Sequence, residues 1–209
     1  MAAIAVALLT LMATPAPAQT AISLVTPDGR VGCVQGMTGI GRPQAWQGIA
    51  DPDGPGGWVL VETANDATDL RFPLCMLPGA VTRDIEATLR FRIVSGTRER
   101  VAGLVLRAQD AVNYYVVRAS ALDESVKFYR VQNGRRGQLG GKEAPVKAGQ
   151  WQVLGVKLVA DKFEVSLDGA PLFTTTDRGL PQPGAIGVWS QADSLTHFGV
   201  LTVANPSPR

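Results

Sequence analysis

The 209-residue sequence carries 20 Lys and Arg against 18 Asp and Glu, so its net charge at pH 7 is only +2. No run of Lys and Arg forms the basic footprint of a nucleic-acid-binding protein, which excludes that class of partner. Hydrophobic residues make up 45% of the chain, an ordinary globular value that excludes global disorder. The length, together with 23 glycines and 14 prolines that favour turns, suits one large all-β domain.

The N-terminus has the features of a secretory signal peptide. An apolar stretch runs from Ile4 to Ala13 and is too short to span a bilayer. The small residues of Ala16-Pro17-Ala18 then form a cleavage site. No Lys or Arg precedes the apolar stretch, so the alternative is a truncated or wrongly assigned start. We expect residues 1–18 to be a signal peptide, the protein to be exported to the periplasm or the extracellular space, and no other segment to span a membrane.

The sequence contains two cysteines, Cys33 and Cys75. In an oxidising compartment we expect them to form a disulfide, which contributes about 3–4 kcal/mol in the chain-entropy model. The alternative is a pair of buried thiols.

Short runs rich in Val, Leu, Phe and Tyr alternate with turn residues from Trp58 onward, which is typical of a two-sheet antiparallel β-sandwich or jelly roll. Residues 19–57 are richer in Gly, Pro and Asp, and we expect an irregular segment with one or two short strands, packed on the sandwich. The sandwich spans residues 58–203, and a tail follows over 204–209. The predicted strands are Trp58–Glu62, Leu70–Cys75, Arg83–Val94, Val101–Ala108, Asn113–Ala119, Ser125–Gln132, Trp151–Val159, Phe163–Leu167, Ala185–Ser190 and Leu195–Val203.

Alternation along these strands predicts which side chains enter the core, because successive residues face opposite sides of a sheet. Along Arg83–Val94 the apolar set alternates with a polar set that includes Asp84, Glu86, Arg90 and Arg92. The predicted inward side chains of this strand and of the later pair Trp151–Val159 and Phe163–Leu167 are Ile85, Ala87, Leu89, Phe91, Ile93, Leu154, Val156, Leu158, Phe163, Val165 and Leu167.

The three middle strands predict a candidate binding surface. We pair Val105 with Val116, Gly103 with Arg118, Arg107 with Tyr114 and Ala119 with Val126, because a slip of one residue would mix apolar and polar sets. The predicted core set is Leu104, Leu106, Tyr115, Val117 and Phe128. The opposite face then forms a polar and aromatic platform of Arg107, Tyr114, Arg118, Lys127 and Tyr129.

Six runs of the sequence match a known pattern: Ala102-Gly103-Leu104-Val105-Leu106-Arg107, Asn113-Tyr114-Tyr115-Val116-Val117-Arg118-Ala119, Arg71-Phe72-Pro73-Leu74, Gly149-Gln150-Trp151, Leu167-Asp168-Gly169 and Gly187-Val188-Trp189-Ser190-Gln191-Ala192-Asp193-Ser194. With these runs the chain resembles the concanavalin A-like lectin/glucanase superfamily, and more narrowly the exported bacterial laminin G-like jelly rolls related to the 3-keto-disaccharide hydrolase domain. The chain departs from that group at Phe198-Gly199-Val200, where Phe-Asp-Asp is usual. The resemblance implies a concanavalin A-like jelly roll and an association with glycans.

Catalytic chemistry has few candidate residues. Asp84 and Glu86 share a strand face and lie about 7 Å apart along the backbone, a separation suited to a glycosidase pair. The Glu-x-Asp-x-x-Glu motif of the superfamily's glucanases lacks its third acid here, so we favour a solvated strand face balanced by arginines. His197 is the only histidine, and we expect a packed or surface residue rather than a member of a triad or zinc site.

Calcium is the one metal ion that the residues leave as a candidate. Asp51 and Asp53 lie in a Gly/Pro-rich loop and Asp193 in another, and calcium takes such oxygen ligands. Asp and Gly are also ordinary turn formers, which is the interpretation we favour, so we expect no cofactor. The glycines between Gly134 and Gly141 form no phosphate-binding motif, and we expect a hairpin tip that exposes Arg135 and Arg136.

Among the four tryptophans we expect Trp151 to plug the sandwich, whereas Trp189 has the parity of an outward ligand-binding residue. Together with the platform, Trp189 completes the predicted binding site, since an aromatic face with convergent Arg donors suits a sugar. We therefore predict a non-catalytic glycan-binding or cell-envelope interaction module. The alternatives are a glycoside hydrolase-like enzyme and a structural or adhesive domain that binds another protein.

Overall fold

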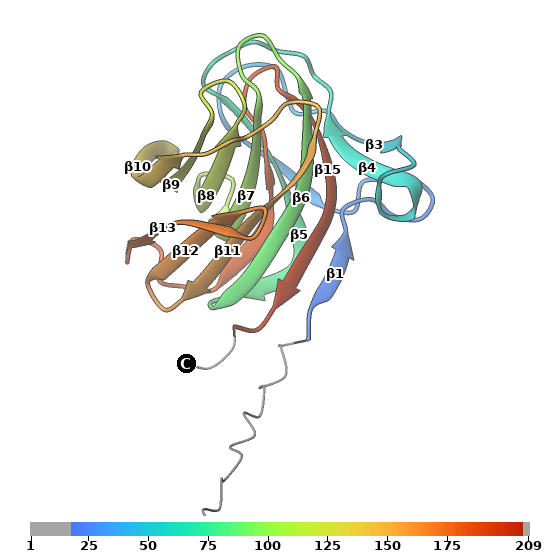
Figure 1. Cartoon of the computed structure of the whole chain (residues 1–209). Helices are drawn as coiled ribbons and strands as arrows, with labels where there is room; N and C mark the ends of the chain where they lie inside the picture. Colours follow the sequence, from blue (N-terminus) through green and yellow to red (C-terminus); the bar gives the residue numbers. More distant parts are fainter. Residues whose placement is uncertain (1–17, 207–209) are drawn as a thin grey trace, which may run out of the picture.

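A computed structural model describes residues 18–206 and shows two antiparallel sheets packed face to face (Figure 1). The predicted signal peptide, apart from Ala18, lies outside the described residues. The eight-stranded sheet contains, in spatial order, β13 (Ala170–Thr176), β12 (Lys162–Leu167), β11 (Trp151–Val159), β6 (Ile85–Ser95), β15 (Leu195–Ala204), β4 (Trp58–Glu62) and β3 (Trp46–Ala50), with β1 (Thr20–Ser23) paired to β15. The seven-stranded sheet contains β10 (Arg135–Glu143), β9 (Ser125–Gln132), β8 (Asn113–Ser120), β7 (Val101–Asp110), β14 (Gly184–Trp189), β5 (Arg71–Thr82) and β2 (Val34–Gly39).

The predicted alternation is confirmed along β6, where every apolar residue from Ile85 to Ile93 is buried and each residue between them is partly exposed. The predicted register of the middle strands is confirmed as well, with Val105 opposite Val116 and Ala119 opposite Val126. The core between the sheets closes on three packed rings, Tyr115, Phe128 and Phe163, whose centroids lie 4.5–5.5 Å apart. The two-sheet β-sandwich is therefore confirmed, and its core residues are those that parity predicts.

The segment before β4 is more regular than its composition indicates. Residues 19–57 contribute three strands, where we expect one or two, and these strands extend both sheets. Two further strands, β10 and β13, lie at the edges of the two sheets and are not among the predicted strands. Neither edge strand alternates apolar with polar residues, because most of its side chains are exposed and few of them enter the core. The expected glycine-rich hairpin tip is thus largely strand β10, although Arg135 and Arg136 are exposed as predicted.

The predicted disulfide is confirmed between Cys33 and Cys75, whose Cα atoms lie 5.4 Å apart. It joins the residue before β2 to the middle of β5 and so fixes the N-terminal segment to the seven-stranded sheet. Among residues 18–206 there is no helix with the length and apolar character needed to cross a membrane.

Candidate ligand-binding site

The outer face of the seven-stranded sheet, where we expect the platform, is filled by its own aromatic side chains. Trp189 lies flat against Gly103 on the neighbouring strand, where a Cβ atom would approach the indole ring to 2.8 Å. Its Nε1–H group donates to the hydroxyl oxygen of Tyr114 at 3.2 Å. Both Trp189 and Tyr114 are fully buried, so neither ring is available to stack on a sugar.

These two rings belong to a second hydrophobic cluster that is separate from the core between the sheets. Its buried members are Phe72, Leu74, Val101, Val105, Ala108, Tyr114, Val116, Tyr129, Val131 and Trp189. Contacts across the face hold the cluster closed, because the Thr38 hydroxyl on β2 bonds to Tyr114 on β8 and Arg136 on β10 lies over the ring of Phe72 on β5. The expected open platform is instead a closed layer, of which Tyr129 is 9% exposed.

Arg107 does not lie on this face, which corrects the predicted register at the end of β7. The pairing of β7 with β8 shifts after Leu106, and Arg107 adopts a left-handed φ of 48°. This bulge turns the side chain away from Tyr114, so that its Nε–H donates to the Arg83 carbonyl at 2.8 Å and its guanidinium contacts Asp84 at 3.4 Å. Arg107 is therefore engaged in contacts within the fold and does not face a ligand on the platform.

Arg118 and Lys127 lie at the margin of the face, opposite each other in the register. Arg118 is buried and its guanidinium contacts Glu99 at 2.8 Å and Asp123 at 3.5 Å. Lys127 contacts the same Asp123 at 2.7 Å. Burial acts to raise the pKa of the Asp123 carboxyl group, but hydrogen bonds from Lys127, Ser120 and Ser125 outweigh it and hold the pKa below its ordinary value. These charges neutralise one another, which leaves little of either cation for a ligand.

The other predicted site residues also have structural partners. Asp84 accepts hydrogen bonds from the Ala160 N–H group and from Arg107, whereas Glu86 faces Lys157 on the outer face of the eight-stranded sheet. Trp151 does not plug the sandwich but lies on that same outer face, under the guanidinium groups of Arg90 and Arg92.

The three candidate calcium ligands are divided between two places. Asp51 receives a hydrogen bond from His197 at 2.7 Å and contacts Arg92, which also contacts Asp53. Asp193 lies in another loop. No group of three or more His, Cys, Asp or Glu side chains in the described part of the chain is arranged to hold a metal ion.

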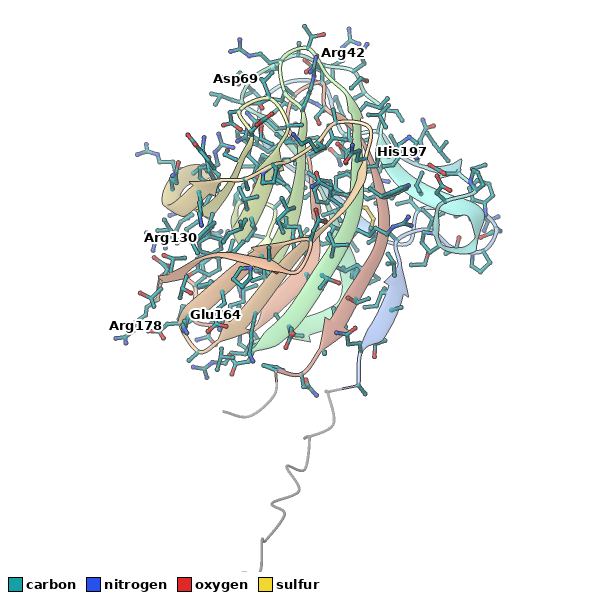
Figure 2. The ribbon with its side chains drawn as sticks, in the orientation of Figure 1. Arg42, Asp69, Arg130, Glu164, Arg178 and His197 are labelled. Atoms are coloured by element: carbon teal, nitrogen blue, oxygen red, sulfur yellow. A yellow bond between two sulfur atoms is a disulfide. The ribbon has the colours of Figure 1, made fainter. Side chains whose placement is uncertain are left out.

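A cavity of about 700 Å³ opens among the loops at one end of the sandwich, the end where Arg42 and Asp69 are labelled in Figure 2. The loops that precede β5, β7 and β15 contribute most of its wall. It is lined by Glu62, Thr63, Asn65, Val94, Ser95, Gly96, Thr97, Arg100, Ala148, Asp193, Ser194 and Leu195. We call this space the loop-end cavity.

Asp193 fixes one wall of the loop-end cavity. Its carboxylate accepts hydrogen bonds from the backbone N–H groups of Thr97, Arg98 and Glu99 at 2.7–3.1 Å. Burial acts to raise the pKa of Asp193, but these N–H donors outweigh it and hold the pKa below the ordinary value of 3.8. The neighbouring Ser194 hydroxyl bonds to both the N–H and the carbonyl group of Val101, so the loop before β7 is held at two points.

A buried ion pair fixes the opposite wall. The Arg71 guanidinium donates to both oxygens of Glu62, at 2.8 and 2.9 Å, and both side chains are almost fully inaccessible to solvent. Arg71 also donates to the carbonyl groups of Arg42 and Pro43 in one loop and of Ala192 in another, so one side chain joins two loops. Because breaking such a pair would strand a buried charge, this wall is rigid.

Four cavity side chains keep hydrogen-bonding groups free. Within residues 18–206, the Asn65 amide and the Ser95 and Thr97 hydroxyls have no hydrogen-bond partner. Arg100 uses only Nε, which donates to the Gly96 carbonyl at 2.9 Å. These groups line a preformed space together with the apolar Val94 and Leu195, the combination by which proteins hold small polar ligands.

The loop-end cavity was not predicted, although the sequence contains two motifs that lead to it. Two runs that carry the family resemblance, Arg71-Phe72-Pro73-Leu74 and Ala192-Asp193-Ser194, meet at its walls, with Arg71 bound to the Ala192 carbonyl. Parity along strands finds residues on sheet faces and gives no information about loops, so the free groups at Asn65, Ser95 and Arg100 have no pattern that singles them out.

The order of the strands and the packing of the two sheets define an antiparallel jelly roll of the concanavalin A-like class, which confirms the expected fold. No protein-family model matches the sequence, and no curated protein sequence matches it significantly.

Three solved structures illustrate the likeness. The carbohydrate-binding module CBM66 from Bacillus subtilis is 19% identical, with a TM-score of 0.65 over 81% of this chain and 96% of that one. A Bacillus subtilis protein of unknown function with a galectin-like fold is 11% identical, with a TM-score of 0.61 over 84% and 90%. Domain 4 of AbnA, an extracellular arabinanase from Geobacillus stearothermophilus solved with arabinotriose, is 14% identical, with a TM-score of 0.54 over 84% of each chain. At these identities the likeness shows a shared fold.

Proposed function

We propose that this protein is an exported, non-catalytic glycan-binding module that holds its saccharide in the loop-end cavity. The observation that carries the proposal is a rigid cavity of about 700 Å³ that presents free amide, hydroxyl and guanidinium groups beside apolar side chains. Sugars offer hydroxyl groups and apolar C–H faces, which match this lining. The fold, shared with a carbohydrate-binding module and with a domain solved in complex with arabinotriose, supports the same function.

The state of the two cavity carboxylates favours binding over hydrolysis. A glycosidase needs one carboxyl group as a proton donor and a second as a nucleophile or base. Both oxygens of Glu62 accept hydrogen bonds from Arg71, and the oxygens of Asp193 accept hydrogen bonds from three backbone N–H groups. Each carboxylate therefore accepts hydrogen bonds that support a wall, which suits a scaffold rather than an acid catalyst.

Export is part of the proposal. The Cys33–Cys75 disulfide suits an oxidising compartment, and glycans of the cell envelope or of extracellular polymers are encountered there. N-terminal sequencing of the native protein checks this part, with Gln19 expected as the first residue.

The test measures affinity for saccharides and its dependence on the cavity. An array of neutral and acidic oligosaccharides, with arabinotriose included, identifies a ligand, and isothermal titration then compares the wild type with Asn65→Gly and Arg100→Gln. Asn65 has a left-handed φ of 44°, so glycine removes the amide without backbone strain. We expect each variant to lose about tenfold in affinity with an unchanged melting temperature. Arg178→Gln, which removes an exposed charge near the other end of the molecule (Figure 2), is the control.

Absence of saccharide binding, or binding that both cavity variants retain in full, would contradict the proposal. Release of new reducing ends from a bound oligosaccharide would show hydrolysis and favour the enzyme alternative.

A further inference from the structure

Arg136 is held in a fixed position above an aromatic layer. It lies on β10, and its guanidinium carbon is 4.8 Å from the ring centroid of Phe72, 4.7 Å from that of Tyr129 and 5.9 Å from that of Trp189. One Nη1–H group donates to the Gln191 side-chain oxygen at 3.1 Å. The side chain is nevertheless exposed to solvent. The rings fix the plane of the guanidinium, while its remaining N–H groups are free to bind another molecule.

No carboxylate in the described part of the chain pairs with this cation. Arg71, Arg92 and Arg118 each contact an Asp or Glu side chain within 4 Å, whereas the hydrogen-bond partner of Arg136 is the neutral amide of Gln191. Three rings orient this guanidinium and no carboxylate of the described residues neutralises it, so its positive charge can pair with an anionic group of a ligand.

The space beside Arg136 is lined by further basic and amide side chains. An open hollow of about 770 Å³ follows the β9–β10 hairpin and is lined by Arg130, Gln132, Asn133, Arg135, Arg136, Gly137, Gln138 and Leu139. We call it the hairpin hollow. None of these lining residues is acidic. Arg130 is paired with Asp177, but Arg135 and the amides of Gln132 and Gln138 have no partner within residues 18–206.

We propose that the hairpin hollow is a second saccharide site, in which Arg136 binds the carboxylate of a uronic acid unit. A planar guanidinium matches a carboxylate with two parallel N–H···O bonds, and side-chain amides can donate to and accept from sugar hydroxyls. That the acid belongs to a saccharide rests on the proposed function; that the ligand is anionic rests on the charges of the hollow alone.

The hairpin hollow is distinct from the loop-end cavity, although one segment connects them. Gln191, which orients Arg136, lies two residues before Asp193, which fixes the cavity wall. The two linings share no residue, so a substitution in one leaves the lining of the other intact and the two sites can be tested separately.

The experiment compares charged and uncharged forms of the same oligosaccharides. Isothermal titration uses oligomers of galacturonate, glucuronate and mannuronate, each alongside its methyl ester, which keeps the sugar chain and removes the charge. At least one acid should bind about tenfold more tightly than its ester. Arg136→Gln should lose that preference, and Arg136→Lys should lose most of it because an ammonium group cannot form the paired bonds. Arg178→Gln removes one positive charge from another part of the surface and should retain the preference for the acid over the ester.

The two proposals fail in different ways. Equal binding of acid and ester by the wild type, binding of no uronate at all, or equal losses in Arg136→Gln and Arg178→Gln would overturn the uronate site. Binding of dextran sulfate or poly-glutamate as tightly as the uronates would overturn it too, since any polyanion would then suffice. Asn65→Gly should leave uronate binding in the hollow unchanged, so a failure of the loop-end cavity alone appears as a separate result. If Arg136→Gln unfolds, Arg136→Lys, which keeps the charge, supplies the comparison with Arg178→Gln.

Discussion

Each sheet carries on its outer face one tryptophan that lies against a glycine of a nearby strand. On the seven-stranded sheet Trp189 covers Gly103, is fully buried and donates its Nε1–H to Tyr114. On the eight-stranded sheet Trp151 lies against Gly199, is only partly buried, and is covered by Arg90 and Arg92 at 4.1 and 4.7 Å.

The same local arrangement therefore has two outcomes, and what covers the ring decides between them. Apolar neighbours and Phe72, stacked at 5.5 Å, make Trp189 part of a second core. Trp151 is held by charged side chains, because Arg92 is fixed by Asp51 and Asp53. Its indole Nε1–H group has no hydrogen-bond partner among residues 18–206. The stability of the outer face of the seven-stranded sheet should therefore depend on side-chain volume. That of the eight-stranded sheet should depend on the charges of the side chains that cover Trp151.

Trp189→Ala should have the largest effect. Removing a fully buried indole costs about 3–5 kcal/mol of unfolding free energy, as for other large core residues. Trp151→Ala, which removes a partly exposed ring and its cation–π contacts, should cost less than about 2 kcal/mol. Urea unfolding of both variants measures the difference, and equal losses would show that the eight-stranded sheet also has a second core.

Arg118→Ala should come next, with a loss of about 3 kcal/mol, because it strands the Glu99 carboxylate at a buried margin of the face. Lys127→Ala is the matched control and should cost less than about 1 kcal/mol, since its pair with Asp123 is partly exposed. Melting temperatures together with saccharide affinity per folded molecule separate the roles. A stable Arg118→Ala protein with weakened binding would restore this arginine to a ligand site.

Gly103→Ala should destabilise by about 1–3 kcal/mol, as overpacking of a filled site does. The added methyl group would lie 2.8–2.9 Å from Trp189 and 3.1 Å from Val116, so the ring must move. Gly199→Ala places a methyl group 3.3 Å from both the Arg90 carbonyl oxygen and the edge of Trp151, and it should cost less because these contacts are wider than those at Gly103. A reversed order in thermal unfolding would mean that the arginines hold Trp151 more firmly than packing holds Trp189.

The smallest expected effect is the loss of stability at low pH when Asp51 becomes protonated. Burial acts to raise the pKa of Asp51, but hydrogen bonds from His197 and Asp53 and the charge of Arg92 outweigh it and hold the pKa below the ordinary 3.8. A lowered folded-state pKa means that this stabilisation is complete above about pH 4 and is lost as the pH falls through the lower value. We expect acidification to expose Trp151 to acrylamide quenching while Trp189 stays protected, at a cost of about 0.5–1 kcal/mol for a partly exposed pair. Single-tryptophan variants report each ring, and Asp51→Asn should reproduce the exposure of Trp151 at neutral pH.

The sequence predicts the sheet interior well and the sheet exterior poorly. Alternation identifies Ile85 to Ile93 and the Tyr115–Phe128 pair as core because burial between two sheets imposes a period of two. The same parity places Tyr114 and Trp189 outward, which is where they lie, but parity carries no information about a second layer above them. That layer depends on Arg136, which reaches Phe72 from a strand at the other side of the sheet.

The bulge at Arg107 and the loop-end cavity escape prediction for a related reason. The left-handed backbone conformation of Arg107 does not change the alternation of apolar and polar residues along β7, so the sequence pattern cannot predict it. The cavity walls are formed by contacts between distant residues, such as Arg71 with Ala192, 121 residues apart. Residue types alone do not determine which loops meet. The resemblance to lectin-like jelly rolls identifies the motifs, and the structure adds where they converge.

The pairing of β1 with β15 sets the direction in which this protein presents its cavity. Thr20 lies beside Val203, so the two ends of the folded part lie next to each other (Figure 1). Leu195, at the start of β15, lines the cavity, and Ala204 lies about 30 Å further along the strand. Whatever is joined at either end is therefore attached on the side remote from the cavity. A tether attached there would orient the module with the opening of its cavity directed away from the point of attachment.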